Sequence, residues 1–134
     1  MNSGDTIPTK ALARAGENAT ILIHEATFAD DKTNMAREKK HSTVGQALQA
    51  ADDMQAWRVI VTHLSQRYSK YMPELRTCVG GKELASGARA SAAFDGMCVR
   101  FSMLPFLPAL TPALNAFMGE IACEAAEAAA QEST

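Results

Sequence analysis

The stretch Thr20–Phe28, which reads TILIHEATF, constrains the fold most, because an apolar run stops abruptly at two ionisable residues. The run Ile21–Ile23 is short and rich in β-branched residues, which is typical of a strand buried on both faces. The run Arg58–Val61 repeats the pattern and is followed closely by His63. Because open α/β sheets bind their ligands beyond the carboxyl ends of the strands, we predict a metal or proton-transfer site along one sheet edge.

Helix and strand patterns alternate along the rest of the chain, which predicts a layered α/β fold. Thr6 and Pro8 favour the start of a helix that Gly16 ends as its C-cap. Ser42 or Thr43 is expected to cap a later helix. In chain order we predict a helix over Pro8–Ala15, a helix over Val44–Met54, a strand over Trp57–Thr62, a loop over Pro73–Ala92, a third strand over Met97–Phe101, breaks at Pro105, Pro108 and Pro112, and a helix over Leu114–Gln131.

The composition excludes several classes of protein. A chain of 134 residues is one domain or a piece of one. The net charge of −2 gives no general attraction to nucleic acid, so any RNA contact needs a local basic patch. Three cysteines without a CxxC motif indicate free thiols in a reducing compartment, so we expect an intracellular protein. No apolar run is long enough to cross a membrane, and the N-terminus has no signal-peptide pattern.

The residues that could carry chemistry all stand at the boundaries of predicted elements. They are Asp5, which follows a glycine, the pair His24 and Glu25, and the two further histidines His41 and His63. No two of the histidines have the spacing of a self-contained metal site. Core or capping histidines therefore remain the alternative to ligands when only the spacing is considered.

Four motifs resemble those of tRNase Z, the metallo-β-lactamase-fold endoribonuclease that matures tRNA 3′ ends. They are GDT at Gly4–Thr6, HEATF at His24–Phe28, HST at His41–Thr43 and THLSQRY at Thr62–Tyr68, in the family's order and approximate spacing. The resemblance implies the C-terminal part of a metallo-β-lactamase αβ/βα fold, incomplete, over residues 1–117. Residues 118–134 are then a C-terminal helical tail. Residues 93–114 are similar to the long, eukaryote-like form.

The resemblance also implies roles for the boundary residues. Asp5 matches the aspartate that bridges two zinc ions, and His63 matches a histidine that ligates one of them. His41 matches the histidine that donates a proton to the leaving 3′-oxygen. Glu25 and His24 match the pair that supports the site, and we favour an orienting role for them over direct ligation.

Three residues near these motifs are candidates for phosphate or RNA binding. Ser42 and Thr43 stand before a helix N-terminus, where free N–H groups bind anions, although both residues are first of all helix caps. Arg67 either binds phosphate or pairs with a carboxylate. The charged stretch Asp30–Lys40 is either a solvated helix or a mobile loop, and we favour a solvated face over an RNA-binding patch for its charges.

The chain lacks the HxHxDH cluster that supplies most of the family's zinc ligands. Asp5 and His63 alone cannot complete a two-zinc site, because each zinc ion takes about four ligands. We therefore expect part of a zinc-dependent endonuclease acting on precursor tRNA, inactive as this chain alone. The chain would come from a truncated gene model, be an engineered piece or form part of a split enzyme. The alternatives are a non-catalytic half that binds a separate chain carrying the rest of the fold, and a related phosphodiesterase for small substrates, against which the HST motif argues.

Overall fold

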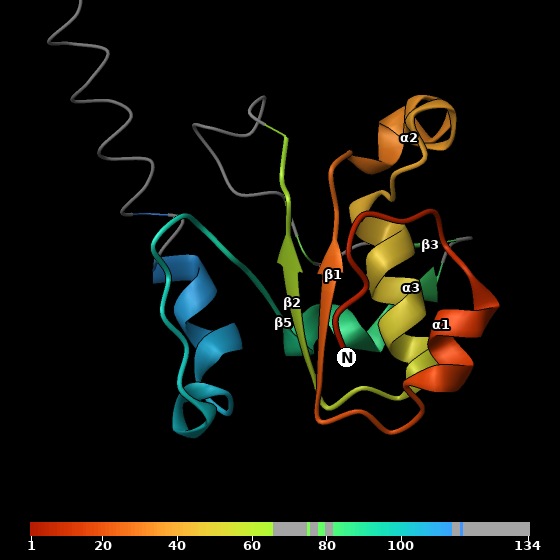
Figure 1. The fold of residues 1–134 in the computed structure, drawn as a ribbon. Coiled ribbons are helices and arrows are strands. Elements are labelled where there is room, and N and C mark those ends of the chain that lie inside the picture. The colour runs from red at the N-terminus through yellow and green to blue at the C-terminus, as the bar shows by residue number, and fades with distance from the viewer. Residues whose placement is uncertain (66–74, 76–77, 80–81, 114–115, 117–134) are drawn as a thin grey trace, which may run out of the picture.

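A parallel sheet of three strands forms the centre of the computed structural model, which describes residues 1–65, 75, 78–79, 82–113 and 116 (Figure 1). Its strands are β1 (Ile21–Glu25), β2 (Arg58–Thr62) and β5 (Ala90–Ala92), in that order across the sheet. Ile23 lies beside Ile60, and Ile60 lies beside Ser91. Because parallel neighbours need long connections, helices cross between these strands and cover the sheet, as the predicted α/β architecture requires.

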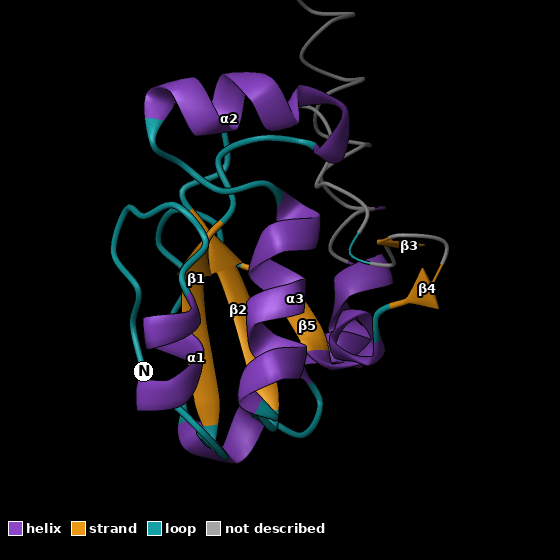
Figure 2. Ribbon diagram, turned by 90° about the vertical axis from the view of Figure 1, so that its right-hand side faces the viewer, coloured by secondary structure: helices purple, strands orange, loops and turns teal. Residues whose placement is uncertain are grey.

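Helix α3 (Val44–Met54) packs on one face of the sheet and forms the main core. Its apolar stripe meets β1 and β2, and Leu22, Val59 and Val61 are buried against it. Helix α1 (Lys10–Ala15) lies along α3 (Figure 2). The two helices approach closely at Gly16, where a β-carbon would stand 2.6 Å from the Met54 side chain. A larger residue at position 16 would therefore require the end of the Met54 side chain to shift.

The segment 97–107 covers the other face of the sheet. Ile60 is buried there with Leu104 and Leu107, while Ile21 and Ile23 are only partly covered. Strand β2 is thus buried on both faces, as its apolar run predicts, whereas β1 is buried on the α3 face and half-buried on the other. The segment includes the short turn η4 (Phe101–Met103), after which residues 107–113 are helical.

Helical turns also lie beyond the carboxyl ends of β1 and β2. These are η1 (Asp30–Lys32) and α2 (Thr33–Lys39), at the top of Figures 1 and 2. The remaining short elements are the antiparallel pair β3 (Cys78–Val79) and β4 (Lys82–Glu83), and η3 (Ala85–Arg89), which an Arg89–Asp52 ion pair of 2.9 Å ties to α3. Within the part of the chain that is described, no helix combines the length and apolarity needed to cross a bilayer.

Two predicted elements are wrong in position. The third strand is β5 rather than Met97–Phe101, and it falls inside the stretch predicted as a loop. Ala90–Ala92 carries only small buried side chains, so it lacks the alternation that identifies a strand. Met97–Phe101 shows such alternation, but its apolar side chains pack as a covering segment rather than in the sheet.

The ends of the helices also differ from the predictions. Thr9, not Thr6, caps α1, and its hydroxyl accepts from the Leu12 N–H, so the helix starts at Lys10. Residues 107–113 are helical although they contain Pro108 and Pro112. Pro108 stands in the first turn, where its missing N–H is not needed. The predicted helix over Leu114–Gln131 lies outside the described residues, apart from residue 116.

Candidate metal centre

Asp5, His41 and His63 converge at the carboxyl edge of the sheet. Each offers one ligand atom, and these atoms all lie within 4.8 Å of one another. His63 Nδ1 lies 2.8 Å from Asp5 Oδ1, and the rings of His41 and His63 are 5.2 Å apart between centroids. The three residues come from an N-terminal turn, the turn between α2 and α3, and the end of β2. The structure thus brings together the three groups that the sequence placed at separate boundaries.

Left-handed backbone conformations position two members of this group. Gly4 has φ +59° directly before Asp5, and glycine adopts this conformation without a side-chain clash. His63 has φ +55° directly after β2, which is uncommon for a residue with a β-carbon. Backbone strain of this kind persists where the surroundings hold it, and it clusters at functional sites.

Glu25 organises the site from within the protein, where it is 2% exposed. Its Oε1 accepts hydrogen bonds from the backbone N–H groups of Thr6, at 3.2 Å, and Ser42, at 2.8 Å. The same atom lies 3.1 Å from His41 Nδ1. One carboxylate therefore ties the GDT turn and the HST turn to the end of β1, which agrees with an orienting role.

Thr27 is a member of the site that the sequence analysis missed. Its hydroxyl donates to Glu25 Oε2 at 2.9 Å and lies 3.3 Å from Nδ1 of both His41 and His63. Its backbone N–H also donates to Glu25 Oε2, at 3.0 Å. Thr27 lies inside the HEATF motif, but a hydroxyl residue two positions after Glu25 does not by itself distinguish a site residue from a turn residue.

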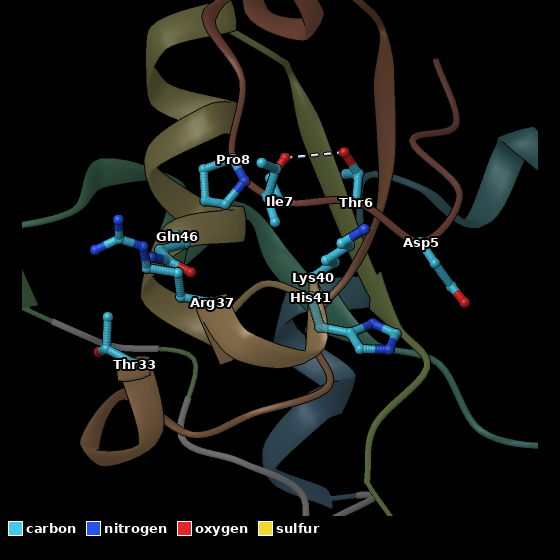
Figure 3. A pocket seen from close by; sticks show the side chains of 9 residues that line it. All are labelled: Asp5, Thr6, Ile7, Pro8, Thr33, Arg37, Lys40, His41 and Gln46. Atoms are coloured by element: carbon cyan, nitrogen blue, oxygen red, sulfur yellow. Dashed lines mark hydrogen bonds between the residues drawn. The ribbon is translucent and has the colours of Figure 1, made fainter. Parts of the chain in front are cut away.

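His41 is held through one side of its ring. Nδ1 is the atom beside the Glu25 carboxylate, so the hydrogen-bond pattern assigns a proton to Nδ1. Nε2 is then the ring atom left for a ligand or substrate. The side chain is 22% exposed, and in Figure 3 the ring extends from the turn after α2 toward the side on which Asp5 lies.

His24 lies in the core and not in the converging group. It is completely buried, its Nδ1 lies 2.6 Å from the Glu25 carbonyl oxygen, and its Nε2 has no hydrogen-bond partner among the described residues. Burial lowers the pKa of His24, although the hydrogen bond to the Glu25 carbonyl and the Glu25 charge both act in the opposite direction. A neutral ring at this place supports the strand end that carries Glu25 and does not reach Asp5 or His63.

Ser42 and Thr43 are both buried, and their polar groups already have partners. The Ser42 hydroxyl donates to the Thr6 carbonyl oxygen at 2.7 Å. Thr43 forms a capping box with Gln46, and the Gly45 N–H donates to Asp30. The structure thus shows the capping role for Thr43 and not for Ser42, and the N-terminal N–H groups of α3 are occupied. Phosphate binding by Ser42 and Thr43 stays a prediction, and Arg67 lies outside the described residues.

The donor set of this group fits a zinc site in part. A carboxylate and imidazole nitrogens are ordinary zinc ligands, and here they lie close enough to share an ion. Asp5 and His63 are accessible, with 63% and 48% of their side chains exposed. Three groups are fewer than the ligands that two zinc ions need, so this chain can hold only one side of such a centre.

The chain is similar to several known proteins, although no protein-family model matches it. The chain is 42% identical over 123 residues to human "Zinc phosphodiesterase ELAC protein 2", which covers 89% of the chain. It is 42% identical over 118 residues to "Ribonuclease Z, mitochondrial" of Drosophila melanogaster, which covers 88% of the chain. In both comparisons the matched segment makes up only 14% of the relative.

Solved structures show the same fold. A long-form RNase Z from yeast matches with a TM-score of 0.70 and 33% identity, over 86% of this chain and 15% of that one. The short form of human tRNase Z matches with a TM-score of 0.53 and 28% identity, over 72% of this chain and 31% of that one. The metallo-β-lactamase fold protein YhfI of Bacillus subtilis, at 19% identity and a TM-score of 0.52, shares the fold over 72% of this chain and 37% of that one.

Proposed function

Because the chain is homologous to a segment of about 120 residues of long-form tRNase Z, in the metallo-β-lactamase superfamily, we propose that it supplies part of a zinc-dependent endoribonuclease centre. The proposed reaction is removal of 3′ trailers from precursor tRNA. The observation that carries the proposal is the convergence of Asp5, His41 and His63 from three separate turns at one sheet edge.

Asp5 and His63 are the residues that would hold zinc in this proposal. Their carboxylate and imidazole stand 2.8 Å apart and are open to solvent, so both can turn toward an ion. Bound zinc would polarise the phosphate and neutralise charge that develops on it. The ligands that complete the centre would come from a HxHxDH cluster, which this chain does not contain.

His41 is the proposed general acid. With Nδ1 held by Glu25, protonated His41 can donate from Nε2 to the 3′-oxygen that leaves the phosphate. The Glu25 carboxylate keeps the ring in one orientation through its contact with Nδ1. Thr27 adds a second contact to Nδ1, which restricts rotation of the ring.

A second candidate function is a non-catalytic half that binds a separate chain. The observation that favours it is the exposure of large apolar side chains after the sheet, with Phe101 78% exposed and Phe106 66% exposed. Exposed apolar groups of this size mark surfaces that partners cover. Co-purification of a chain carrying HxHxDH would support this function, and a stable monomer that recruits no such chain would argue against it.

A chimeric enzyme tests the proposed nuclease function. The matched segment of the yeast long-form RNase Z is replaced by this chain, and 3′ cleavage of a precursor tRNA is measured with zinc. We expect cleavage by the chimera, and a loss of at least about 100-fold for Asp5→Asn, His63→Asn and His41→Asn. Asp53→Asn is the matched control, because Asp53 is exposed and lies on α3 away from the group. Unchanged cleavage by Asp5→Asn and His63→Asn would refute the assignment.

A further inference from the structure

A cleft of about 680 Å³ opens beside the converging group, within the size range of about 300–1,000 Å³ that ligand sites have. Asp5 and His41 belong to its lining, together with Arg37, Lys40 and Gln46. Ile7 and Pro8 add an apolar wall. We call this space the α2 cleft, because two of its charged side chains come from the end of α2. It shares residues with the site described above but extends well beyond it.

Arg37 and Lys40 give the α2 cleft a local positive charge in a chain whose net charge is −2. Both side chains are exposed, and within the described residues no carboxylate forms an ion pair with either of them. Asp5, the acid in the lining, already lies 2.8 Å from His63. Among the described residues, these two cations therefore have no carboxylate partner and are available to an anion.

The backbone of Lys40 has a defined conformation at the end of α2. Lys40 ends α2 in the left-handed conformation, with φ +60°. Its backbone N–H donates to the carbonyl oxygens of Ala36 and Arg37, which fixes the backbone at this residue. In the view of Figure 3, Lys40 lies between Asp5 and the pair Arg37 and Gln46. Lys40 therefore lines the α2 cleft from the end of α2, next in the chain to His41.

Gln46 adds a neutral donor with a fixed orientation. Its Oε1 accepts a hydrogen bond from the Thr43 N–H at 2.9 Å, so its Nε2 is the polar atom left for a ligand. A guanidinium, an ammonium and an amide N–H₂ group all donate. The cleft therefore fits a ligand that is anionic and rich in acceptors, with an apolar or planar part to lie against Ile7 and Pro8.

We propose that the α2 cleft binds the nucleotide unit of single-stranded RNA that adjoins the cleaved phosphate. Arg37 and Lys40 hold its phosphate, Gln46 donates to its base or sugar, and Ile7 with Pro8 contacts the base. This proposal rests on the proposed nuclease function, because that function makes RNA the substrate. It makes Arg37 and Lys40 positioning residues, which fix the strand relative to His41 without touching the reacting atoms.

Nucleotide binding by the chain itself tests the proposal. The probes are cytidine 5′-monophosphate, cytidine and inorganic phosphate, each titrated into the metal-free 134-residue chain with EDTA, and backbone amide shifts are followed by NMR. We expect the monophosphate to shift the amides of Arg37, Lys40 and Gln46, and to bind at least about fivefold more tightly than cytidine or phosphate. Equal binding of phosphate and monophosphate would overturn the nucleotide assignment, and no binding of the monophosphate would overturn the cleft as a site.

Variants identify the residues responsible. The double variant Arg37→Gln with Lys40→Gln should weaken monophosphate binding at least about tenfold. Lys39→Gln is the matched control, since Lys39 precedes Lys40, carries the same charge and does not line the cleft. Equal weakening by Lys39→Gln would show nonspecific attraction and overturn the proposal. Native amide spectra of all variants exclude misfolding as the cause of weaker binding.

The same measurements separate this proposal from the proposed function. Nucleotide binding is measured without zinc and without cleavage, so it does not depend on Asp5 or His63 holding a metal. Monophosphate binding together with an inactive chimera would refute the nuclease function and leave the cleft. An active chimera whose cleavage keeps the same KM after the Arg37→Gln and Lys40→Gln changes would refute the cleft and leave the nuclease function.

Discussion

Oε1 of Glu25 lies 3.1 Å from Nδ1 of His41, although 15 residues and a helix separate the two in the sequence. The contact links the end of β1 to the turn that begins α3. Because the same oxygen also accepts the Ser42 N–H, at 2.8 Å, the position of the His41 ring is coupled to the backbone of its own turn. A change at Glu25 should therefore affect the fold as well as the chemistry.

Replacing Glu25 with glutamine should destabilise the chain by about 1–3 kcal/mol, because an amide offers one acceptor oxygen where two are used. Donors from Thr27 or Ser42 would then face an N–H₂ group. Urea unfolding followed by circular dichroism measures the effect. Glu17→Gln is the control, since Glu17 is exposed and should change stability by less than about 0.5 kcal/mol. Equal midpoints for the two variants would contradict the central role given to Glu25.

His24 should make stability depend on pH. Burial lowers its pKa below 6.5, so below pH 6.5 the unfolded chain binds a proton that the folded chain does not. Stability is therefore present above pH 6.5 and is lost as the pH falls below that value, by up to about 1.4 kcal/mol per pH unit. The variant His24→Leu removes this contribution while other groups continue to titrate. As the pH is lowered from 7.5 to 5, the unfolding free energy of the wild type should fall more than that of His24→Leu. Parallel curves for the two chains would contradict the prediction.

The sequence predicts the elements that have a strong apolar pattern. The runs at α3 and β2 give these elements to within a residue, and the run Ile21–Ile23 lies inside β1. Asp5, His41 and His63 are among the residues placed at element boundaries, but the sequence alone does not show that these three converge. Strand β5 could not be predicted, because three small buried residues carry no periodic signal. Thr27 and the Glu25 contacts also could not be predicted, because they depend on three turns meeting in space.

The left-handed backbone at His63 should make glycine more stable than alanine at this position, whatever the role of the imidazole. With φ +55°, an alanine at this position is destabilised by a steric clash of about 1–2 kcal/mol, whereas glycine has no such clash. His63→Gly should therefore unfold at higher urea than His63→Ala, although both lose the contact with Asp5. The same pair at Thr62, inside β2, should give the reverse order by about 0.5–1 kcal/mol. If alanine were the more stable residue at both positions, the strained conformation would not be present in solution.

The chain alone should not cleave precursor tRNA, even with zinc. The group formed by Asp5, His41 and His63 offers three ligand atoms, whereas two zinc ions in a hydrolytic centre need about four ligands each. Incubating the purified chain with precursor tRNA and zinc, and separating the products on a gel, measures any cleavage. The chimera described above is the positive control, and the Asp5→Asn chain identifies cleavage by a contaminant, which this change would leave unaffected. Zinc-dependent cleavage that the wild-type chain shows and the Asp5→Asn chain lacks would mean that these three residues suffice for activity.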